Sequence, residues 1–375
     1  MSETARNYSK DKIFHHPEKI ESIVTGNVTA PVSVRIKPTN ICNHGCFYCT
    51  YADRRGGGKS SFSGIHEETN VRDSIPREKM MEILDDFSEI GVKAITYSGG
   101  GEPLLYKYIQ ETLETTLKKG IDLAMITHGQ FLMDSKAESL RHAKWVRISQ
   151  DAINSEEFSR IRNMDGDTLE KIKRNATEFV KIKDRDCVLG INFVVSKENK
   201  NHIYEGARMW KEIGVNYVRF SPVWGPDFLN YHSDHRKYVE EQISLARSDF
   251  EGKGFDVHDS FIADFEYEGL PIRTYNWCPM MQMAPVIGAD QKVYFCHNKA
   301  YSDDGCFGSI KDKSFKDLWF SRETQRIFNE FNPEISCKHQ CVKDRKNILI
   351  VKAIADKKIP KPGELGDPGP HVNFV

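Results

Sequence analysis

Between residues 32 and 220, two patterns of apolar side chains take turns along the chain. Short runs rich in β-branched and aromatic residues are typical of strands, and the stretches between them repeat apolar residues every three or four positions, as amphipathic helices do. A clear helical stripe lies between Pro76 and Gly91 and consists of Met80, Ile83, Leu84 and Phe87. The predicted strands cover residues 32–36, 92–97, 121–126, 145–148, 188–195 and 217–220, and further helices are predicted near 107–119, 134–143, 155–181 and 202–213.

The order of these elements predicts the fold class. Strands separated by helices of this length form βαβ units with a parallel sheet. Six predicted strands are too few for a closed eight-stranded barrel. A partial (β/α)6 barrel of the TIM type and an open doubly wound sheet both fit the pattern, and the α/β partial barrel is the fold that we expect.

The pattern changes after Trp224-Gly225-Pro226, where a charged helix near 236–252 leads into irregularly spaced elements. Here we expect a hairpin that turns near Asp290 and a helix capped by Ser314. Prolines after Ile359 favour an extended tail. The expected division is an N-terminal extension at 1–30, the partial barrel at 31–225, a helical linker at 226–270, a small α+β cysteine-rich module at 271–345 and an extended tail at 346–375.

Charge and hydropathy exclude several classes of protein. Lys and Arg total 53 and Asp and Glu total 54, so the formal net charge is −1. A protein that binds nucleic-acid phosphates normally has a basic surplus, so we expect no nucleic-acid partner. No apolar run is long enough for a transmembrane helix, and the polar N-terminus lacks the apolar segment of an export signal. We therefore expect a cytoplasmic protein with reduced thiols and no membrane partner.

The nine cysteines favour metal binding, because an odd number makes a poor disulfide framework in a reducing compartment. Cys42, Cys46 and Cys49 form a C-x3-C-x2-C run directly after the first predicted strand. Three thiolates on one loop can hold three irons of a [4Fe–4S] cluster and leave the fourth iron open for catalysis. Active sites of parallel α/β proteins also lie at the carboxyl ends of the strands. A zinc site completed by His44 or His66 is the alternative.

This run resembles the signature of the radical S-adenosylmethionine (radical SAM) superfamily, C-x3-C-x-aromatic-C, with Tyr48 as the aromatic residue. Residues 98–103, Ser-Gly-Gly-Gly-Glu-Pro, match the Gly-Gly-Glu motif of that family. Thr127-His128-Gly129 departs from the family, in which Thr-Asn-Gly is common. The resemblance implies that S-adenosylmethionine is contacted by Tyr48 beside the adenine, by Gly100, Gly101 and Glu102 at the methionine ammonium, by Ser149 and Asp151 at the ribose, and by Asn192.

The resemblance also implies the cofactors and the chemistry. The cofactors are S-adenosylmethionine and a [4Fe–4S] cluster held by Cys42, Cys46 and Cys49. In this family the reduced cluster cleaves S-adenosylmethionine to methionine and a 5′-deoxyadenosyl radical, which abstracts a hydrogen atom from the substrate. We therefore expect an oxygen-sensitive enzyme and an electron donor such as flavodoxin or ferredoxin as a partner.

A second group of cysteines comprises Cys278, Cys296, Cys337 and Cys341. Four thiolates can complete a second [4Fe–4S] cluster or a tetrahedral zinc site. Residues 275–345 resemble the auxiliary-cluster modules of radical SAM enzymes, called SPASM when they hold two clusters and twitch when they hold one. Only five cysteines lie in this part, so one auxiliary [4Fe–4S] cluster and a twitch-like module are expected.

Two cysteines remain outside these groups. Cys187 begins the fifth predicted strand, away from the expected active site, so we interpret it as structural. Cys306 is interpreted as a small buried thiol, with two alternatives. It could return a hydrogen atom to a substrate radical, as cysteines do in some relatives, or replace Cys278 or Cys296 as a ligand.

The substrate is the least determined feature, and three hypotheses stay open. The enzyme could oxidise or epimerise a small polar molecule of the sugar, nucleotide-sugar or aminocyclitol type, or modify a peptide or protein side chain; a non-catalytic iron–sulfur or zinc-binding protein is the third hypothesis. We favour the first, because residues 1–41 are too few for the leader-binding domain of many peptide-modifying relatives. Oxidation would use the auxiliary cluster as an electron acceptor, and epimerisation would need a donor such as Cys306. Candidate substrate contacts near strand ends are Lys37, Tyr97, His128 and Arg219.

Overall fold

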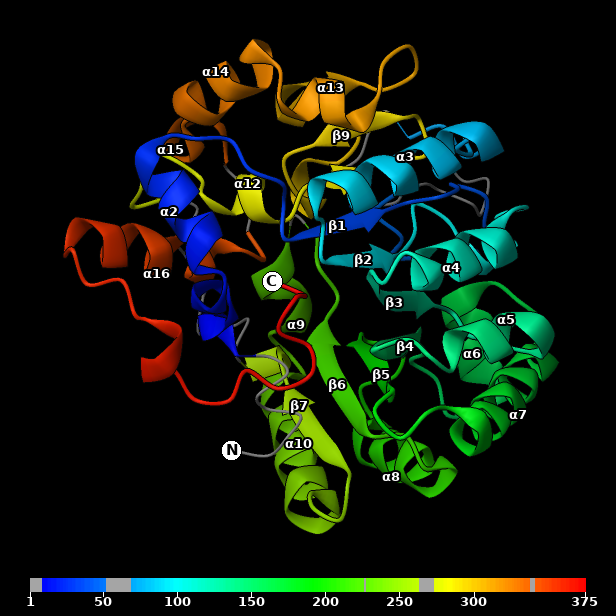
Figure 1. Ribbon diagram of the computed structural model, residues 1–375. Helices are drawn as coiled ribbons and strands as arrows, with labels where there is room; N and C mark the ends of the chain where they lie inside the picture. The colour runs from blue at the N-terminus through cyan, green and yellow to red at the C-terminus, as the bar shows by residue number, and fades with distance from the viewer. Residues whose placement is uncertain (1–8, 52–68, 226, 263–272, 338–340) are drawn as a thin grey trace.

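In the part of the chain that the structure describes, the strands form one ten-stranded sheet at the centre of the protein (Figure 1). The structure is a computed structural model that describes residues 9–51, 69–225, 227–262, 273–337 and 341–375, so His66, a possible zinc ligand, lies outside it. The strands follow the order β10-β9-β8-β1-β2-β3-β4-β5-β6-β7. Their bounds are β1 (Ser33–Ile36), β2 (Ala94–Tyr97), β3 (Asp122–Thr127), β4 (Trp145–Ser149), β5 (Val188–Val195), β6 (Tyr217–Pro222), β7 (Asp256–Asp259), β8 (Val286–Ile287), β9 (Lys292–Tyr294) and β10 (Cys306–Ser309).

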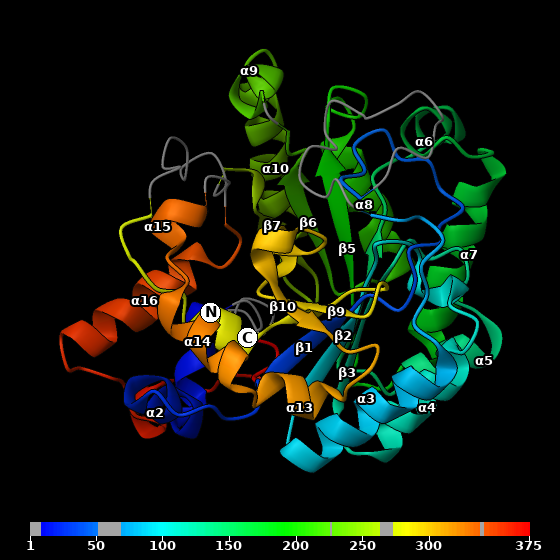
Figure 2. The same cartoon turned by 90° about the horizontal axis from the view of Figure 1, so that it is seen from above.

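The strands β1 to β6 are parallel and lie where the sequence predicts them. Helices cover the outer side of this curved sheet, as the view from above shows (Figure 2). This arrangement is an α/β partial barrel of the TIM type, so the predicted fold class is confirmed. The helices after β1 to β6 are α3 (Arg77–Ile90), α4 (Ile109–Lys118), α5 (Asp134–Leu140), α6 (Ser155–Arg162), α7 (Asp167–Ile182), α8 (Ile203–Ile213), α9 (Phe228–His232) and α10 (Arg236–Phe250).

Helix α3 shows how the apolar stripe positions the outer layer. The side chains of Met80, Ile83, Leu84 and Phe87 are fully buried in the main core. The helix ends at Gly91, which has a left-handed φ of +87° and donates its N–H to the Phe87 carbonyl. Glycine adopts this conformation without the steric cost of a Cβ atom, so the predicted helix end is confirmed.

The helix predicted over residues 155–181 is wrong, because the chain forms two helices there, α6 and α7. Asn154 caps α6 by accepting a hydrogen bond from the Glu157 N–H. The helix stops at Asn163, whose φ of +51° takes the chain into the left-handed region. Asparagine tolerates this conformation better than most residues do. The break matters for the site, because it makes Arg162 the last residue of α6.

A seventh parallel strand, β7, lies in the segment that was expected to be a helical linker at 226–270. It pairs with β6, with Val218 beside Val257. Only Val257 of this four-residue strand is buried, so no clear strand pattern marks it in the sequence. The part of the linker that the structure describes therefore includes a strand of the barrel as well as helices.

The cysteine-rich module continues the same sheet. Strand β8 pairs in parallel with β1, and β8, β9 and β10 form an antiparallel meander with its first turn at Gln291, as the hairpin prediction requires. Ser314 caps α13, as predicted, by accepting a hydrogen bond from the Asp317 N–H. The helices of this part are α12 (Met280–Met283), α13 (Phe315–Trp319), α14 (Arg322–Glu330), α15 (Pro333–Ser336) and α16 (Asp344–Ala355).

Helix α16 corrects the prediction of an extended tail over 346–375. Asn347 and Ile350 are fully buried on one face of α16, and Ile354 packs against the same core. This spacing is helical, and the prolines that argued against a helix come only after Ile359. The boundaries between the expected domains stay predictions.

The last residues of the chain close the N-terminal end of the barrel. The ring of His371 donates a hydrogen bond to the Lys144 carbonyl (3.0 Å), and Asn373 donates to the Asp122 carboxylate (2.7 Å). Phe374 packs edge-on against Trp145. The tail thus covers the end of the barrel opposite to the loops that follow β1 to β6. No helix in the described parts of the chain is long and apolar enough to cross a membrane.

Candidate functional site

The loop with the first three cysteines follows β1 at the carboxyl edge of the sheet. Its backbone is held by the end of α6, because the N–H groups of Gly45 and Phe47 donate to the carbonyls of Arg162 (2.8 Å) and Ile161 (3.2 Å). None of the three cysteines forms a disulfide within the described residues, and all three are partly exposed. The structure therefore places the predicted ligands on a braced loop at the edge where parallel α/β proteins keep their active sites.

Arg162 links this loop to the end of β4. Its guanidinium donates to the Cys46 sulfur (3.3 Å), to the Asp151 carboxylate (2.9 Å) and to the Ser149 carbonyl (2.9 Å). It also lies 5.8 Å from the centre of the Tyr48 ring. Sequence reasoning missed this residue, although it joins four of the predicted site residues. A buried arginine at a helix end carries no sequence pattern that distinguishes it from an exposed one.

Tyr48 and Asp151 lie together although 102 residues separate them in the sequence. The Tyr48 hydroxyl donates to the carboxylate of Asp151, which is fully buried. Burial raises the pKa of Asp151, while the positive charge of Arg162 opposes that shift. Two residues that the family resemblance assigned to one cofactor are thus in direct contact, and their roles toward S-adenosylmethionine stay predictions.

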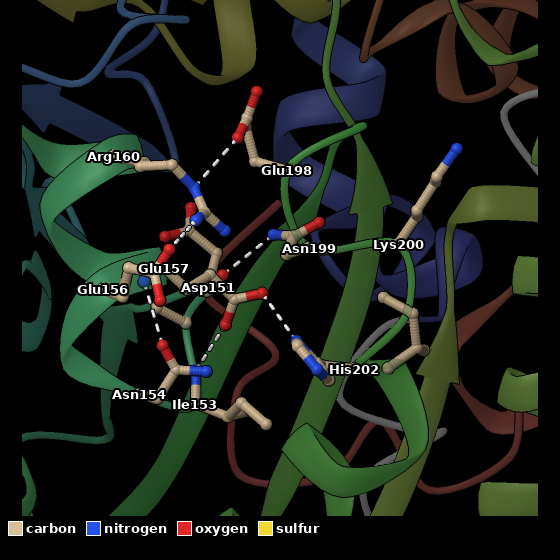
Figure 3. A network of polar contacts seen from close by, with 12 residues as sticks. Asp151, Ile153, Asn154, Glu156, Glu157, Arg160, Glu198, Asn199, Lys200 and His202 are labelled. Carbon is tan, nitrogen blue, oxygen red and sulfur yellow. Dashed lines mark hydrogen bonds and ion pairs between the residues drawn. The ribbon is translucent and has the colours of Figure 1, made fainter.

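A network of polar contacts fixes α6 against the neighbouring strands (Figure 3). The buried carboxylate of Glu157 accepts hydrogen bonds from the Ile153 N–H (2.7 Å) and the His202 ring (2.9 Å). The Asn199 side chain donates to the Asp151 carbonyl (2.8 Å). Because these contacts join the ends of β4, α6 and the segment before α8, they also position Arg162.

Asn192 lies next to Ser149 in the register of β4 and β5, and Arg219 of β6 lies on its other side. The Asn192 amide donates to the Ser221 hydroxyl (3.2 Å). Arg219 donates to the Ser260 hydroxyl (2.7 Å). The three neighbouring positions Ser149, Asn192 and Arg219 therefore form a polar row inside the barrel.

The glycine motif packs on the start of the cysteine loop. A Cβ atom on Gly101 would lie 2.2 Å from the Ile41 carbonyl oxygen, and one on Gly100 would lie 1.9 Å from the Asn40 side chain. The N–H of Gly101 donates to the Thr39 carbonyl (3.0 Å). Only glycine allows this close approach, so the motif supports the loop directly before Cys42.

The side chain of Glu102, which belongs to the same motif, points into the protein interior. Its carboxylate is 2% exposed and accepts hydrogen bonds from the Leu104 N–H (3.0 Å), the Thr127 hydroxyl (2.5 Å) and the His128 N–H (2.8 Å). Burial raises its pKa to about 7. The carboxylate joins the ends of β2 and β3, and its predicted contact with a methionine ammonium stays a prediction.

The ring of His128 packs against the cysteine loop. Its ring stacks on His44 with 3.8 Å between ring centres and an angle of 1°. Its Nδ1 accepts from the Gln130 N–H (3.1 Å), so its Nε2 carries the proton and donates to the Asn43 side chain (3.0 Å). Burial lowers the pKa of His128 to about 3, so the ring is neutral at ordinary pH. Its departure from the family pattern thus has a structural role.

The four predicted auxiliary cysteines line one cavity in the C-terminal module. The other residues around it are Arg273, Tyr275, Met280, Phe295, Lys299, Phe331, Pro333, Lys343 and Asn347. Burial raises the pKa of all four thiols, and that of Cys296 reaches about 12. Charges of neighbouring thiolates raise these values further, which is the repulsion that bound metal would relieve.

The donor set of this cavity fits an iron–sulfur cluster. Within the described residues, no three Cys, His, Asp or Glu side chains converge as they would around one bound ion. The four thiols line the wall of a shared space, and thiolates are the ligands of iron–sulfur clusters. The residues between Cys337 and Cys341 lie outside the described chain. The assignment of these four ligands stays a prediction.

Cys306 does not line this cavity. It lies at the start of β10, opposite Tyr294 of β9, and its sulfur accepts a hydrogen bond from the Gly308 N–H (3.3 Å). It also packs against the cluster of Val286, Tyr294, Ala300 and Tyr301, which Tyr51 contacts as well. Cys187 is fully buried, as expected of a structural thiol.

The candidate substrate residues near the strand ends differ in the surroundings of their side chains. Lys37 is buried, and its Nζ lies 3.8 Å from the centre of the Tyr51 ring. Tyr97 is a wrong prediction, because its hydroxyl bonds to Thr116 of α4 (2.7 Å) and so faces the helix layer. Alternation along β2 explains this orientation, since neighbouring strand residues point to opposite faces. His128 supports the loop, as described above.

Comparisons with known proteins agree with these sites. Residues 36–209 match the model of the radical SAM superfamily, and residues 278–342 match SPASM, described as an iron–sulfur cluster-binding domain. A probable GTP 3′,8-cyclase of Methanocaldococcus jannaschii is 30% identical over 196 residues, which cover 51% of this chain and 59% of that protein, less than two thirds of its length. Another probable GTP 3′,8-cyclase, of Metallosphaera sedula, is 24% identical over 317 residues, or 81% of this chain and 91% of the relative.

Solved structures agree at the level of the fold. Streptococcus suis SuiB bound to S-adenosylmethionine has a TM-score of 0.61 at 16% identity, over 82% of this chain and 70% of that one. Both matched models describe iron–sulfur proteins, which favours clusters over the zinc alternatives at both cysteine sites. The chain belongs to the radical SAM superfamily and carries a C-terminal SPASM domain, so its cofactors are S-adenosylmethionine with a [4Fe–4S] cluster and auxiliary iron–sulfur.

Proposed function

We propose that this protein abstracts a hydrogen atom from a small polar substrate of the sugar, nucleotide-sugar or aminocyclitol type, and so oxidises or epimerises it. The observation that carries the proposal is the polar interior of the barrel beside the cysteine loop. Ser149, Asn192 and Arg219 form adjacent inward positions on three strands. A polar substrate can add hydrogen bonds to those that Asn192 and Arg219 already make with Ser221 and Ser260.

The relatives support a small substrate. Two curated relatives have names that specify GTP, a nucleotide, as the molecule on which they act. One of these matches extends over 81% of this chain. A nucleotide sugar shares the phosphate and sugar groups of such a molecule, so it heads the group of substrates to be tested.

Residues of this chain position the groups that surround the reaction site. When bound, the cluster and S-adenosylmethionine supply the 5′-deoxyadenosyl radical of this superfamily. Arg162 keeps Cys46, Tyr48 and Asp151 together, and the tail at 371–375 closes the other end of the barrel against water. An electron must come from a reductant, and we propose a small donor such as flavodoxin or ferredoxin.

The test uses anaerobically reconstituted protein with S-adenosylmethionine and a chemical reductant. Candidate nucleotide sugars, sugars, aminocyclitols and peptides are added separately, and 5′-deoxyadenosine is quantified against a substrate-free reaction. We expect a small polar compound to raise its formation. Loss of two hydrogens from that compound would identify oxidation, and a changed stereocentre at unchanged mass would identify epimerisation.

Matched cysteine variants control this experiment. Replacing Cys42, Cys46 and Cys49 together with Ala should abolish 5′-deoxyadenosine formation, because no thiolate remains to hold the cluster. Cys187→Ala should retain it, since this buried thiol lies in the core away from both cysteine sites. Stimulation by peptides alone would favour the second hypothesis instead, and unchanged turnover in the triple variant would refute radical SAM catalysis.

A further inference from the structure

The side chain of Asn347, on α16, contacts one of the predicted auxiliary ligands. It is fully buried and lines the auxiliary cavity together with the four cysteines. Its amide Nδ2 lies 3.3 Å from the sulfur of Cys278, within hydrogen-bond distance for a sulfur acceptor. An amide group therefore lies directly behind a predicted metal ligand, where it can act on the metal only through that sulfur.

The contact with Met280 decides which end of the Asn347 amide faces the sulfur. The Met280 N–H donates to the amide Oδ1 over 3.0 Å, and a backbone N–H can only donate. The amide oxygen must therefore point at Met280, because its NH2 group would meet another donor there. The thiol of Cys278 also lies 3.6 Å from Oδ1, but a sulfur that binds metal has lost its proton and can only accept. The group that serves a metal-bound Cys278 is thus the amide N–H.

A chain of buried polar groups holds the other N–H of the same amide. Nδ2 of Asn347 also donates to the hydroxyl oxygen of Tyr275 (3.3 Å). This hydroxyl gives its own proton to the buried carboxylate of Asp344, which pairs with the guanidinium of Arg273 (3.3 Å). The positive charge of Arg273 favours the ionised carboxylate, which accepts only. One amide N–H is therefore directed at Tyr275 and the other at Cys278.

Helix α16 places these groups at the cavity. Asp344 lies in its first turn and Asn347 one turn later, so the two buried side chains share one face of the helix. The helix begins soon after Cys341, whereas Cys278 lies just before α12. The bond between Asn347 and Cys278 therefore joins the two segments that carry predicted ligands.

We infer that Asn347 is a positioning residue of the auxiliary site, whose N–H donation to the Cys278 sulfur raises the reduction potential of the cluster. A reduced cluster carries one more negative charge than the oxidised cluster does. Hydrogen bonds to cysteine sulfur stabilise that extra charge, and they are one of the means by which proteins set cluster potentials. The network through Tyr275 and Asp344 keeps the donor in place.

The inference rests on the proposed function, because it concerns the electron that oxidation of the substrate releases. The substrate first gives one hydrogen atom to the 5′-deoxyadenosyl radical. The substrate radical that remains loses one electron, which reduces the auxiliary cluster, and one proton, which passes to water. A higher reduction potential favours this electron transfer, so Asn347 would support oxidation without touching the substrate.

A redox titration followed by electron paramagnetic resonance tests the inference. It uses the reconstituted protein without substrate, in mildly alkaline buffer. The signal that S-adenosylmethionine leaves unchanged reports the auxiliary cluster, because the cofactor binds at the first cluster. We expect Asn347→Leu, which has a similar volume and no donor, to keep its iron and to show a more negative midpoint potential than the wild type.

Further variants separate the hydrogen bond from the packing around it. Asn347→Asp keeps the shape and the acceptor for the Met280 N–H, and it places a carboxylate oxygen at the sulfur, so its potential should also fall. Tyr275→Phe disturbs the same network but leaves the amide bonded to Met280, so its potential should fall less than in Asn347→Leu. Ile348→Ala, at a residue of the same helix that is 38% exposed, should keep the wild-type potential.

Three results would overturn the inference. The first is a wild-type potential in both Asn347 variants. The second is loss of the auxiliary iron from both, which would mean that Asn347 is needed to hold the cluster and does not set its potential. The third is an equal shift in Tyr275→Phe and Asn347→Leu, which would assign the effect to packing of the network.

The titration contains no substrate, so its outcome does not depend on which molecule the enzyme modifies. Formation of 5′-deoxyadenosine with the candidate substrates is measured on the same samples. Stimulation by peptides alone would defeat the proposed function and leave the shift in potential intact. Stimulation by a small polar compound, with unshifted potentials in the Asn347 variants, would defeat the role of Asn347 alone.

Discussion

The guanidinium of Arg162 donates a hydrogen bond to the Cys46 sulfur over 3.3 Å, which ties the end of α6 to the first cysteine loop. A positive charge at this distance favours the thiolate, and it opposes the burial that raises the pKa of Cys46. The same guanidinium pairs with Asp151, which is fully buried. One side chain therefore stabilises a predicted cluster ligand and a predicted cofactor ligand together.

Replacing Arg162 by Gln should destabilise the protein and the site. The substitution leaves the buried Asp151 carboxylate without its cation, and such a loss costs about 3 kcal/mol or more. We expect a lower unfolding midpoint in urea, less iron after reconstitution and a higher KM for S-adenosylmethionine. Arg162→Lys should recover part of the stability, because it keeps the charge and loses the paired hydrogen bonds.

Arg160→Gln is the matched control on the same helix. Arg160 is 48% exposed and forms ion pairs with Glu156 and Glu198. Exposed ion pairs contribute about 1 kcal/mol or less, so iron content and KM should stay at wild-type values. Equal effects of the two substitutions would show that Arg162 acts on α6 in general and has no particular role at Cys46.

Gly101→Ala should displace the start of the cysteine loop. The new Cβ would lie 2.2 Å from the Ile41 carbonyl oxygen, a backbone atom that cannot rotate away. Overpacking of this kind costs about 1–3 kcal/mol, and we expect less iron per chain and a lower thermal midpoint. Gly363→Ala is the control, because its Cβ would meet nothing within 4 Å. A wild-type iron content in Gly101→Ala would contradict the bracing role of the motif.

Much of the fold could be predicted because its strands are buried and its helices are amphipathic. The stripe of α3 and its end at Gly91 illustrate this, since each follows from local physics. The break at Asn163 and the strand β7 could not be predicted in the same way. The first depends on one residue in a left-handed conformation, and the second has one buried side chain, Val257.

The site could be predicted where residues lie in motifs at strand ends. The four auxiliary cysteines line one cavity, as their pairing in the sequence suggests. The role of Arg162 could not be predicted, because it depends on which side chains lie together once the chain has folded. Tyr97 was misassigned for a related reason, since its position near a strand end does not reveal which face it occupies.

His128 should make the stability of the protein sensitive to acid. Its pKa is lowered to about 3 by burial, below the ordinary value of 6.5, so the folded protein binds fewer protons than the unfolded chain between these values. Stability therefore rises with pH through this window and falls below pH 6.5, by about 1 kcal/mol at pH 5.5. His128→Asn, which introduces the residue common in relatives, should reduce this slope in urea unfolding followed between pH 5.5 and 7.5. The rest of the slope should remain, because burial also lowers the pKa of His232, His258 and His371.

His142→Asn is the control for the acid effect. This histidine is 51% exposed and pairs with the Asp184 carboxylate at the surface. Its substitution should leave the fall below pH 6.5 in place. If His128→Asn kept the full slope, then another buried group would be responsible for it.

Cys306→Ala should separate the two reaction types. If the enzyme epimerises its substrate through this thiol, the variant should still form 5′-deoxyadenosine but should lose the epimerised product, because no hydrogen atom is returned. In deuterated water the wild-type product should then carry one deuterium. Full turnover to the same product in Cys306→Ala would remove Cys306 as a hydrogen donor and would favour oxidation.

The number of irons bound per chain tests how the cysteines are divided between the two cluster sites. Two [4Fe–4S] clusters require about eight irons per chain after anaerobic reconstitution. Cys278→Ala combined with Cys341→Ala should reduce this to about four, because both thiols line the auxiliary cavity. Cys306→Ala should keep about eight, since its thiol lies outside that cavity and bonds to the Gly308 N–H. Four irons together with one zinc in the wild type would defeat the auxiliary cluster and leave the first site intact.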